Sequence, residues 1–160
     1  MKKSCIYSGT FDPITNGHLD VIIRAKQIFD KIIVAVAENE VKNPYFSLQE
    51  RIEMAKIATK NLEKVEVLGF DNLLVDFAKQ NNINYIIRGL RAVSDFEYEL
   101  QMGYANSSLW DKIDTVYLMP SLKNAFISSS IVRAVFAHGG DASHLVPQDV
   151  YNLMQKYKRC

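Results

Sequence analysis

The chain has 160 residues, of which 48% are hydrophobic, and its formal net charge is +1. This length predicts one domain that spans residues 1–160, and the near-neutral charge without a basic stripe argues against a nucleic-acid binder. Apolar runs of only a few residues argue against a membrane span and a secretory signal, so we expect a cytoplasmic protein.

The first predicted elements are a strand and a helix joined by a short loop. An apolar run at residues 5–7 ends at Gly9 and predicts a strand. After a turn, a helix is predicted from Thr15, because apolar residues recur at helical spacing as far as Phe29. His18 lies in the first turn of this helix, where free N–H groups and the positive end of the helix dipole favour anions.

The same alternation continues to the end of the chain. Runs of β-branched and aromatic residues predict four more strands, at residues 32–36, 65–68, 85–87 and 115–119. Helical patterns are found at residues 47–58, 73–80, 95–109, 129–137 and 147–157. At the start of the first of these, Ser47 and Glu50 have the spacing of a capping box.

This order of elements predicts an α/β fold with one open, parallel, five-stranded sheet and helices on both of its faces, a Rossmann-like arrangement. In such a sheet, ligands bind outside the carboxyl ends of the strands, at the point where the strand order reverses. The segments that follow the strands are therefore where we expect functional residues.

Basic and hydroxyl side chains follow several of the predicted strands. Lys42 follows the second strand, Arg88 and Arg91 follow the fourth, and serines 128–130 with Arg133 follow the fifth. Together with helix N-termini, these groups favour a site for a polyphosphate. Each group also has an ordinary alternative: a solvated lysine, surface arginines at a turn, and serines that cap a helix.

The common phosphate-binding motifs are missing from the sequence. It contains no G-x-x-x-x-G-K-[ST], and no G-x-G-x-x-G follows the first strand, which disfavours a P-loop NTPase and an ordinary dehydrogenase. The three histidines and two cysteines lack the spacing of metal ligands. We therefore expect no metal site built from protein side chains.

Two short motifs and one longer segment carry a family resemblance. The motifs are TNGH at residues 15–18 and ISSS at residues 127–130, and they resemble those of the nucleotidyltransferase superfamily. With RGLRAVSDFEYE at residues 88–99 and NPYFSLQER at residues 43–51, the chain is similar to bacterial phosphopantetheine adenylyltransferases over essentially its whole length. Ser8 departs from that pattern, in which proline is common, and we expect an effect only on the stiffness of the loop.

The resemblance implies a reaction and an assembly. ATP and 4′-phosphopantetheine would give 3′-dephospho-coenzyme A and pyrophosphate, late in coenzyme A biosynthesis, with Mg²⁺ carried on the phosphates of ATP. The family also implies a homohexamer built as a dimer of trimers, with no nucleic acid or membrane as partner.

The resemblance also implies roles for particular residues. His18 would stabilise charge on the α-phosphate, Lys42 would bridge the phosphates of both substrates, Arg91 would clamp phosphate, and Gly17 would let phosphates approach the backbone. The expected ATP contacts are Thr10, Phe11, His18, Gly89, Leu90, Arg91, Glu99, Asn124, Ala125, Phe126, Ile127, Ser128, Ser129 and Ser130. The expected contacts with the second substrate are Thr10, Lys42, Leu74 and Arg88. From the sequence alone, Glu99 could equally be a solvated helix charge and Leu74 a core residue.

Two rival functions stay open. One is another adenylyl- or cytidylyltransferase of the superfamily with a different phosphate acceptor, which the segment at residues 88–99 disfavours. The other is a nucleotide-binding domain without turnover, which would leave His18, Lys42 and Arg91 no role beyond affinity.

The helix predicted at residues 95–109 is rich in large apolar side chains. Phe96 and Tyr98 point well apart at 100° per residue, so this helix cannot bury all its aromatic residues on one stripe. We expect part of it to face another subunit, where aromatic and methionine side chains are enriched. The alternative is a helix that is buried on two sides within one chain.

Overall fold

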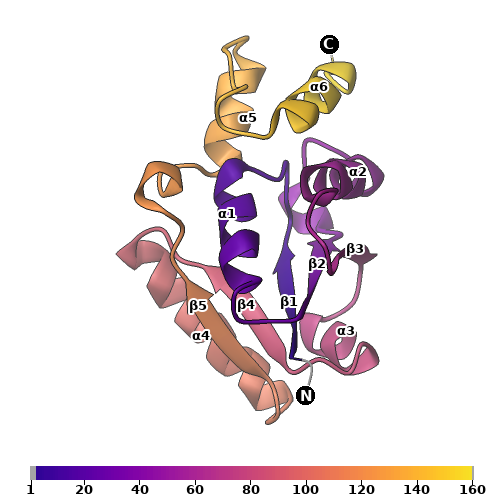
Figure 1. Ribbon diagram of the computed structural model, residues 1–160, viewed down its shortest axis with the longest axis vertical. Helices are drawn as coiled ribbons and strands as arrows, with labels where there is room; N and C mark the ends of the chain where they lie inside the picture. Colours follow the sequence, from indigo (N-terminus) through magenta and orange to yellow (C-terminus); the bar gives the residue numbers. More distant parts are fainter. Residues whose placement is uncertain (1–2, 160) are drawn as a thin grey trace.

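The computed structural model of the protein describes residues 3–159, which alternate between strands and helices (Figure 1). The strands are β1 (Ser4–Gly9), β2 (Lys31–Ala37), β3 (Val65–Phe70), β4 (Tyr85–Gly89) and β5 (Asp114–Leu118). The α-helices are α1 (Asn16–Ala25), α2 (Leu48–Thr59), α3 (Leu74–Gln80), α4 (Val93–Leu109), α5 (Ser129–Ala137) and α6 (Gln148–Lys156). The short 3-10 helices η1 (Glu40–Lys42) and η2 (Leu122–Asn124) follow β2 and β5.

The five strands form one parallel sheet in the order β3-β2-β1-β4-β5. The chain moves outward in one direction from β1 to β3 and then crosses back to β4 on the other side of β1. The strand order therefore reverses between β1 and β4, which is where open α/β sheets bind ligands. This confirms the predicted fold class.

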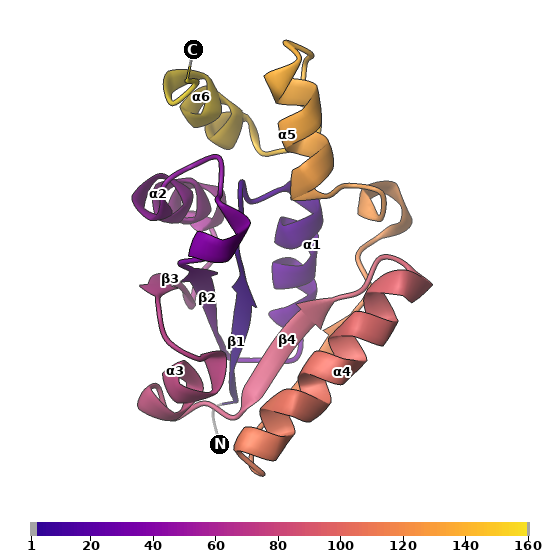
Figure 2. The same cartoon turned by 180° about the vertical axis from the view of Figure 1, so that it is seen from behind.

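The sheet is covered on both faces, and its strands alternate between two cores. Ile32, Val34 and Val36 of β2 belong to the core shared with α1, α2, α5 and α6. Ile33 and Ala35 point to the opposite core, which includes α3 and the residue after α4. Burial on both faces explains why β1 and β2 are nearly continuous apolar runs. Figures 1 and 2 show α1 over one face, with α3 and α4 over the other.

The predicted helix starts are largely confirmed. They were predictable because the residues that cap these helices lie next to the helix starts in the sequence. Thr15 and Ser47 are N-caps, and each forms a reciprocal capping box with the residue three positions on. The helix ends were less well predicted. Helix α1 stops at Ala25, so Phe29 lies beyond it, and Ile23 is 45% exposed rather than on the buried stripe.

Helix α4 lies on the outside of the sheet and presents much of its apolar surface to solvent. The exposed large side chains along it, at 41–69% exposure, are Phe96, Tyr98, Met102, Tyr104 and Leu109. The alternative in which this helix is buried on two sides within one chain is therefore wrong. Within residues 3–159, no helix combines the length and hydropathy needed to cross a membrane.

Candidate active site

A cavity of about 450 Å³ opens at the carboxyl ends of β1 and β4, at the reversal point of the sheet. Gly9 and Gly89, the last residues of these strands, both line it. The predicted site residues that line it are Thr10, Phe11, His18, Lys42, Arg88, Gly89, Arg91, Glu99, Ile127, Ser128, Ser129 and Ser130. The fold thus brings together side chains that the sequence distributes over four loops.

His18 is held in one orientation by the N-cap of its own helix. The backbone N–H of Thr15 donates to His18 Nδ1 at 3.0 Å, and the His18 N–H donates to Thr15 Oγ1 at 3.3 Å. Because Nδ1 acts as the acceptor, the neutral imidazole carries its proton on Nε2. The capping box therefore leaves a defined N–H donor for the cavity.

The surroundings of His18 keep its ring neutral. Burial lowers its pKa to about 3, and the positive charges of Arg91 and Arg88 add to that effect. Aromatic rings enclose it: the ring centroids of Phe11 and Tyr7 lie 5.0 and 6.2 Å from that of His18. Near neutral pH, His18 is thus a hydrogen-bond donor and does not act as a proton acceptor.

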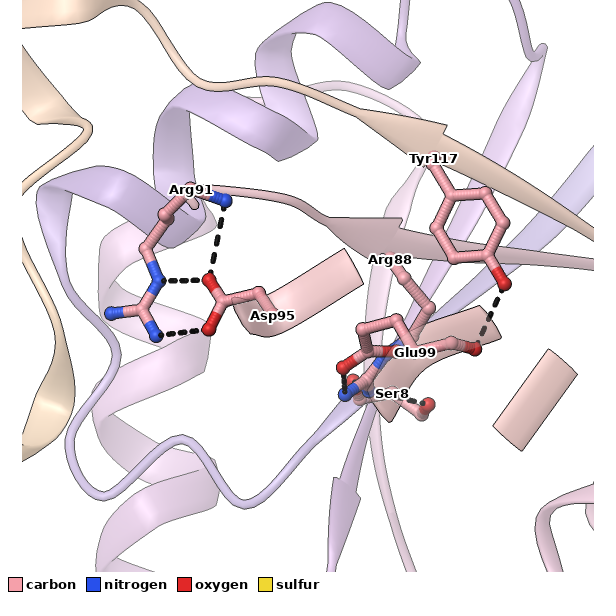
Figure 3. A network of polar contacts seen from close by, with 6 residues as sticks. All are labelled: Ser8, Arg88, Arg91, Asp95, Glu99 and Tyr117. Atoms are coloured by element: carbon pink, nitrogen blue, oxygen red, sulfur yellow. Dashed lines mark hydrogen bonds and ion pairs between the residues drawn. The ribbon is translucent and has the colours of Figure 1, made fainter. Parts of the chain in front are cut away.

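Arg88 forms a bidentate ion pair with Glu99 at the wall formed by β4 and α4 (Figure 3). Arg88 Nε and Nη2 donate to the two carboxylate oxygens of Glu99, both at 2.7 Å, and Nη1 donates to the Ser8 carbonyl at 2.6 Å. Burial alone would lower the pKa of Arg88, but the hydrogen bonds and charge of Glu99 outweigh it and raise that pKa. Glu99 is 8% exposed, so the alternative of a solvated helix charge is wrong.

Arg91 is paired in a similar way, but nearer to solvent. Its Nε and Nη2 lie 3.1 and 3.4 Å from the Asp95 carboxylate, which also accepts the backbone N–H of Arg91 (Figure 3). Asp95 and Glu99 are one helical turn apart on α4, so one face of this helix holds both arginines.

Ser8 lies within β1 and contacts a charged residue of the cavity. It is 5% exposed, and its Oγ lies 3.4 Å from Arg88 Nη1, next to the carbonyl that Arg88 also contacts. A proline at this position would keep the carbonyl but remove the hydroxyl. The departure from the family pattern therefore reaches a charged residue of the cavity, beyond the stiffness of the loop.

The loop between β5 and α5 closes the cavity from a third side. Ser128 caps α5, as one of the sequence alternatives had it, by accepting the Ile131 N–H at 3.2 Å. Ser129 Oγ donates to the Pro13 carbonyl at 2.8 Å, and Arg133 Nη1 donates to the Asp12 carbonyl at 2.7 Å. The serine segment is thus fastened to the loop that precedes α1.

Gly17 has a packing role that the sequence did not reveal. A Cβ built on it would lie 3.3 Å from the Ile127 carbonyl and 3.4 Å from that of Asn124. The lack of a side chain therefore lets the loop after β5 approach the start of α1. Gly17 also lines the cavity, which is compatible with phosphates approaching its backbone. That approach stays a prediction.

The remaining predicted residues lie outside the cavity lining. Leu74 packs against the core that includes α3, in line with the core reading left open by the sequence. The Leu90 N–H donates to the Leu118 carbonyl at 2.9 Å. Asn124 is the last residue of η2, Ala125 follows it, and Phe126 is 59% exposed. Their contacts with substrates stay predictions.

Arg51 was not predicted as part of the site, although it stabilises the backbone at the edge of the cavity. It is 2% exposed, and its Nη1 donates to the carbonyls of Thr10 and Ala37, both at 2.7 Å, while Nε donates to Phe46 at 3.1 Å. One buried cation thus fixes the ends of β1 and β2. The one feature of the sequence that could have indicated the burial of Arg51 is its place on the same helical face as the apolar residues Met54 and Ala55.

Two carboxylates with structural roles were also missed. Asp12 accepts the N–H groups of Tyr45 and Phe46 at 2.8 and 2.9 Å. Asp20 of α1 accepts the N–H of Ser121 in the loop after β5. Both therefore tie loops around the cavity to the β1–α1 unit.

Comparisons with known proteins point in one direction. A family model described as cytidylyltransferase-like matches residues 6–135. A phosphopantetheine adenylyltransferase of Campylobacter concisus is 72% identical over 150 residues, 94% of this chain and 96% of the relative. Those of Campylobacter hominis and Campylobacter fetus subsp. fetus are 64% identical over all of both chains and 70% identical over 94% of each.

Proposed function

The chain belongs to the phosphopantetheine adenylyltransferase family, and from this premise we propose how its cavity works. The reaction is transfer of the adenylyl group of ATP to 4′-phosphopantetheine, giving 3′-dephospho-coenzyme A and pyrophosphate. The observation that carries the mechanism is the neutral His18, held by Thr15 with its Nε2–H free, in a cavity that also contains Arg88 and Arg91.

His18 stabilises the transition state as a donor. The attacking phosphate oxygen of phosphopantetheine is already an anion, so the in-line attack on the α-phosphorus needs no general base. Negative charge spreads over the phosphoryl oxygens as pyrophosphate leaves, and a fixed neutral donor stabilises that charge without reorganisation. Because protonation of His18 is strongly disfavoured, we assign it no proton transfer in the reaction.

The basic residues divide the remaining work. Arg91 clamps the phosphates of ATP, Arg88 binds the phosphate of phosphopantetheine, and the exposed Lys42 at the rim of the cavity bridges the two. In the structure, Arg88 and Arg91 already hold carboxylates. Phosphate oxygens accept hydrogen bonds from a planar guanidinium as carboxylate oxygens do. Either arginine can therefore bind a phosphate in addition to its carboxylate or in place of it.

We propose that Mg²⁺ enters with ATP. The carboxylates that line the cavity are Asp12, Asp95 and Glu99, and each is engaged by an arginine. This donor set fits an ion held by phosphate oxygens better than an ion held by the protein. When bound, the ion neutralises charge on the phosphates.

The same proposal covers assembly and location. We expect residues 1–160 to act as one catalytic domain, in the cytoplasm, within a homohexamer. The exposed apolar side chains of α4 support the assembly, because Phe96, Tyr98 and Tyr104 are 43%, 59% and 69% exposed in the single chain and would be covered between subunits.

A pyrophosphate-release assay tests the function. The protein is incubated with ATP, Mg²⁺ and 4′-phosphopantetheine, and in parallel with nicotinate mononucleotide or glycerol phosphate as the acceptor. We expect pyrophosphate only with 4′-phosphopantetheine. Release with another acceptor, or no release with any of them, would refute the proposal.

A further inference from the structure

Tyr7 places a hydroxyl in the wall of the cavity, and none of the roles proposed for the other cavity residues uses it. The residue lies on β1 opposite Ile87 of β4, so it stands at the reversal point of the sheet. It is 5% exposed and lines the cavity. Among the side chains that the structure describes, its hydroxyl makes no hydrogen bond.

Gly89 lies beside this hydroxyl. A Cβ built on Gly89 would lie 3.6 Å from Tyr7 Oη and 3.2 Å from Val21 Cγ2. A larger residue at position 89 would therefore contact the hydroxyl and crowd this part of the cavity. The missing side chain leaves the space beside Tyr7 Oη open at the end of β4.

The hydroxyl also keeps its proton and is therefore available as a donor. Burial raises the pKa of Tyr7 well above its usual value, and the charges of Arg88 and Arg91 offset this only in part. Tyr7 therefore stays protonated under physiological conditions. The hydroxyl has no hydrogen-bond partner among the described residues and reaches the open cavity, so a ligand oxygen can accept its hydrogen bond in place of water.

We propose that the Tyr7 hydroxyl is a nucleotide-binding group that donates a hydrogen bond to an oxygen atom of bound ATP. This inference rests on the proposed function, with Gly89 and His18 among the expected ATP contacts. Tyr7 is close to both residues, since a Cβ built on Gly89 would lie 3.6 Å from its Oη and its ring centroid is 6.2 Å from that of His18. A nucleotide that contacts both residues therefore comes close to the Tyr7 hydroxyl.

The test uses Tyr7→Phe, which removes only the hydroxyl. Calorimetric titration with ATP and Mg²⁺ should show a Kd raised about three- to tenfold, the effect of one lost hydrogen bond. The Tm of the ligand-free protein should not fall, because the hydroxyl has no partner to lose. The affinity for 4′-phosphopantetheine should be unchanged.

A matched control is Tyr157→Phe. The Tyr157 hydroxyl donates to Glu53 and lies outside the cavity lining, so its removal should leave the Kd for ATP unchanged. Equal ATP affinity in Tyr7→Phe and the wild type would overturn the inference. An effect confined to 4′-phosphopantetheine, or a Tyr7→Phe chain that does not fold, would overturn it as well.

These measurements separate the inference from the proposed function. If the wild type releases pyrophosphate and Tyr7→Phe binds ATP normally, only the role of Tyr7 fails. If the wild type binds ATP but transfers nothing to 4′-phosphopantetheine, the proposed function fails, and the two ATP affinities still decide the role of Tyr7.

Discussion

The two main walls of the cavity are organised differently. On the wall formed by the β1–α1 loop, His18 is neutral and its ring is fixed by the backbone of Thr15. On the wall formed by β4 and α4, Arg88 and Arg91 are charged and held by carboxylates. The first wall is complete before a ligand arrives, whereas the second holds anions that a phosphate can replace. Charge stabilisation is thus assigned to the rigid wall, and substrate capture to the adaptable one.

The largest expected effect comes from removing the donor of the rigid wall. His18→Ala should lower kcat about a hundredfold or more, the loss typical of one oxyanion-type donor, while the KM for ATP should change much less. Steady-state kinetics of pyrophosphate release measures both values.

The matched control for this prediction is His138→Ala. His138 follows α5, is exposed and does not line the cavity, so the variant should keep the wild-type kcat. A His18→Ala variant with near-normal kcat at saturating substrates would remove the distinction between the two walls.

The next effect is a pH dependence of stability that comes from the same residue. The pKa of His18 is lowered from 6.5 to about 3 in the folded chain. Below pH 6.5, the unfolded chain therefore takes up a proton that the folded chain does not, and stability falls as the pH falls. Between pH 7 and pH 5 this contribution is about 2 kcal/mol.

Chemical denaturation at pH 7 and pH 5 measures this contribution when the wild type is compared with His18→Gln. Glutamine keeps a capping side chain at this position but does not titrate. The wild type should lose more stability than the variant on going to pH 5. Equal losses in the two proteins would mean that His18 is not kept neutral by the fold.

A smaller effect is expected from the adaptable wall. Glu99→Gln removes the negative charge that faces the partly buried Arg88, and the free energy of unfolding of the ligand-free protein should fall by about 1.5 kcal/mol. Glu97→Gln is the control, because Glu97 is exposed on the same helix and should change stability by less than about 0.5 kcal/mol. Equal denaturation midpoints for the two variants would argue that the Arg88–Glu99 pair contributes no stability.

The smallest effect concerns Arg91, which lies nearer to solvent than Arg88. Arg91→Lys keeps the positive charge but loses the planar fork, so kcat/KM for ATP should fall about fivefold, the value of roughly one hydrogen bond. Steady-state kinetics at varied ATP concentration measures it. Kinetics indistinguishable from the wild type would make Arg91 an ordinary surface charge at the cavity rim.

The fold was predictable because its signals are local. Each predicted strand is a short run of apolar and β-branched residues, buried on both faces in β1 and β2, and the capping boxes at Thr15 and Ser47 lie within four residues of sequence. The end of α1 was harder to predict, because apolar residues continue to Phe29 after the helix stops at Ala25. Phe29 still joins the core from the segment between α1 and β2, whereas Ile28 is 52% exposed.

The site was predictable only in part, because its supports are long-range contacts. The positions of His18, Arg88 and Arg91 follow from the ends of β1 and β4. The backbone partners of Asp12 are 33 and 34 residues away, and that of Asp20 is 101 residues away. No local pattern reports such contacts. Arg51 was missed because an arginine within a helix usually lies in solvent.

The capping box at the start of α1 limits how this chain can evolve. Residue 18 must satisfy the backbone of Thr15 and must also offer a neutral donor to the cavity. Glutamate, a common residue at this capping position, would keep the helix start but repel phosphate, and alanine would lose both properties. Glutamine keeps the cap and an N–H donor on a more flexible side chain. Of these three replacements, glutamine alone keeps both the cap and a neutral donor.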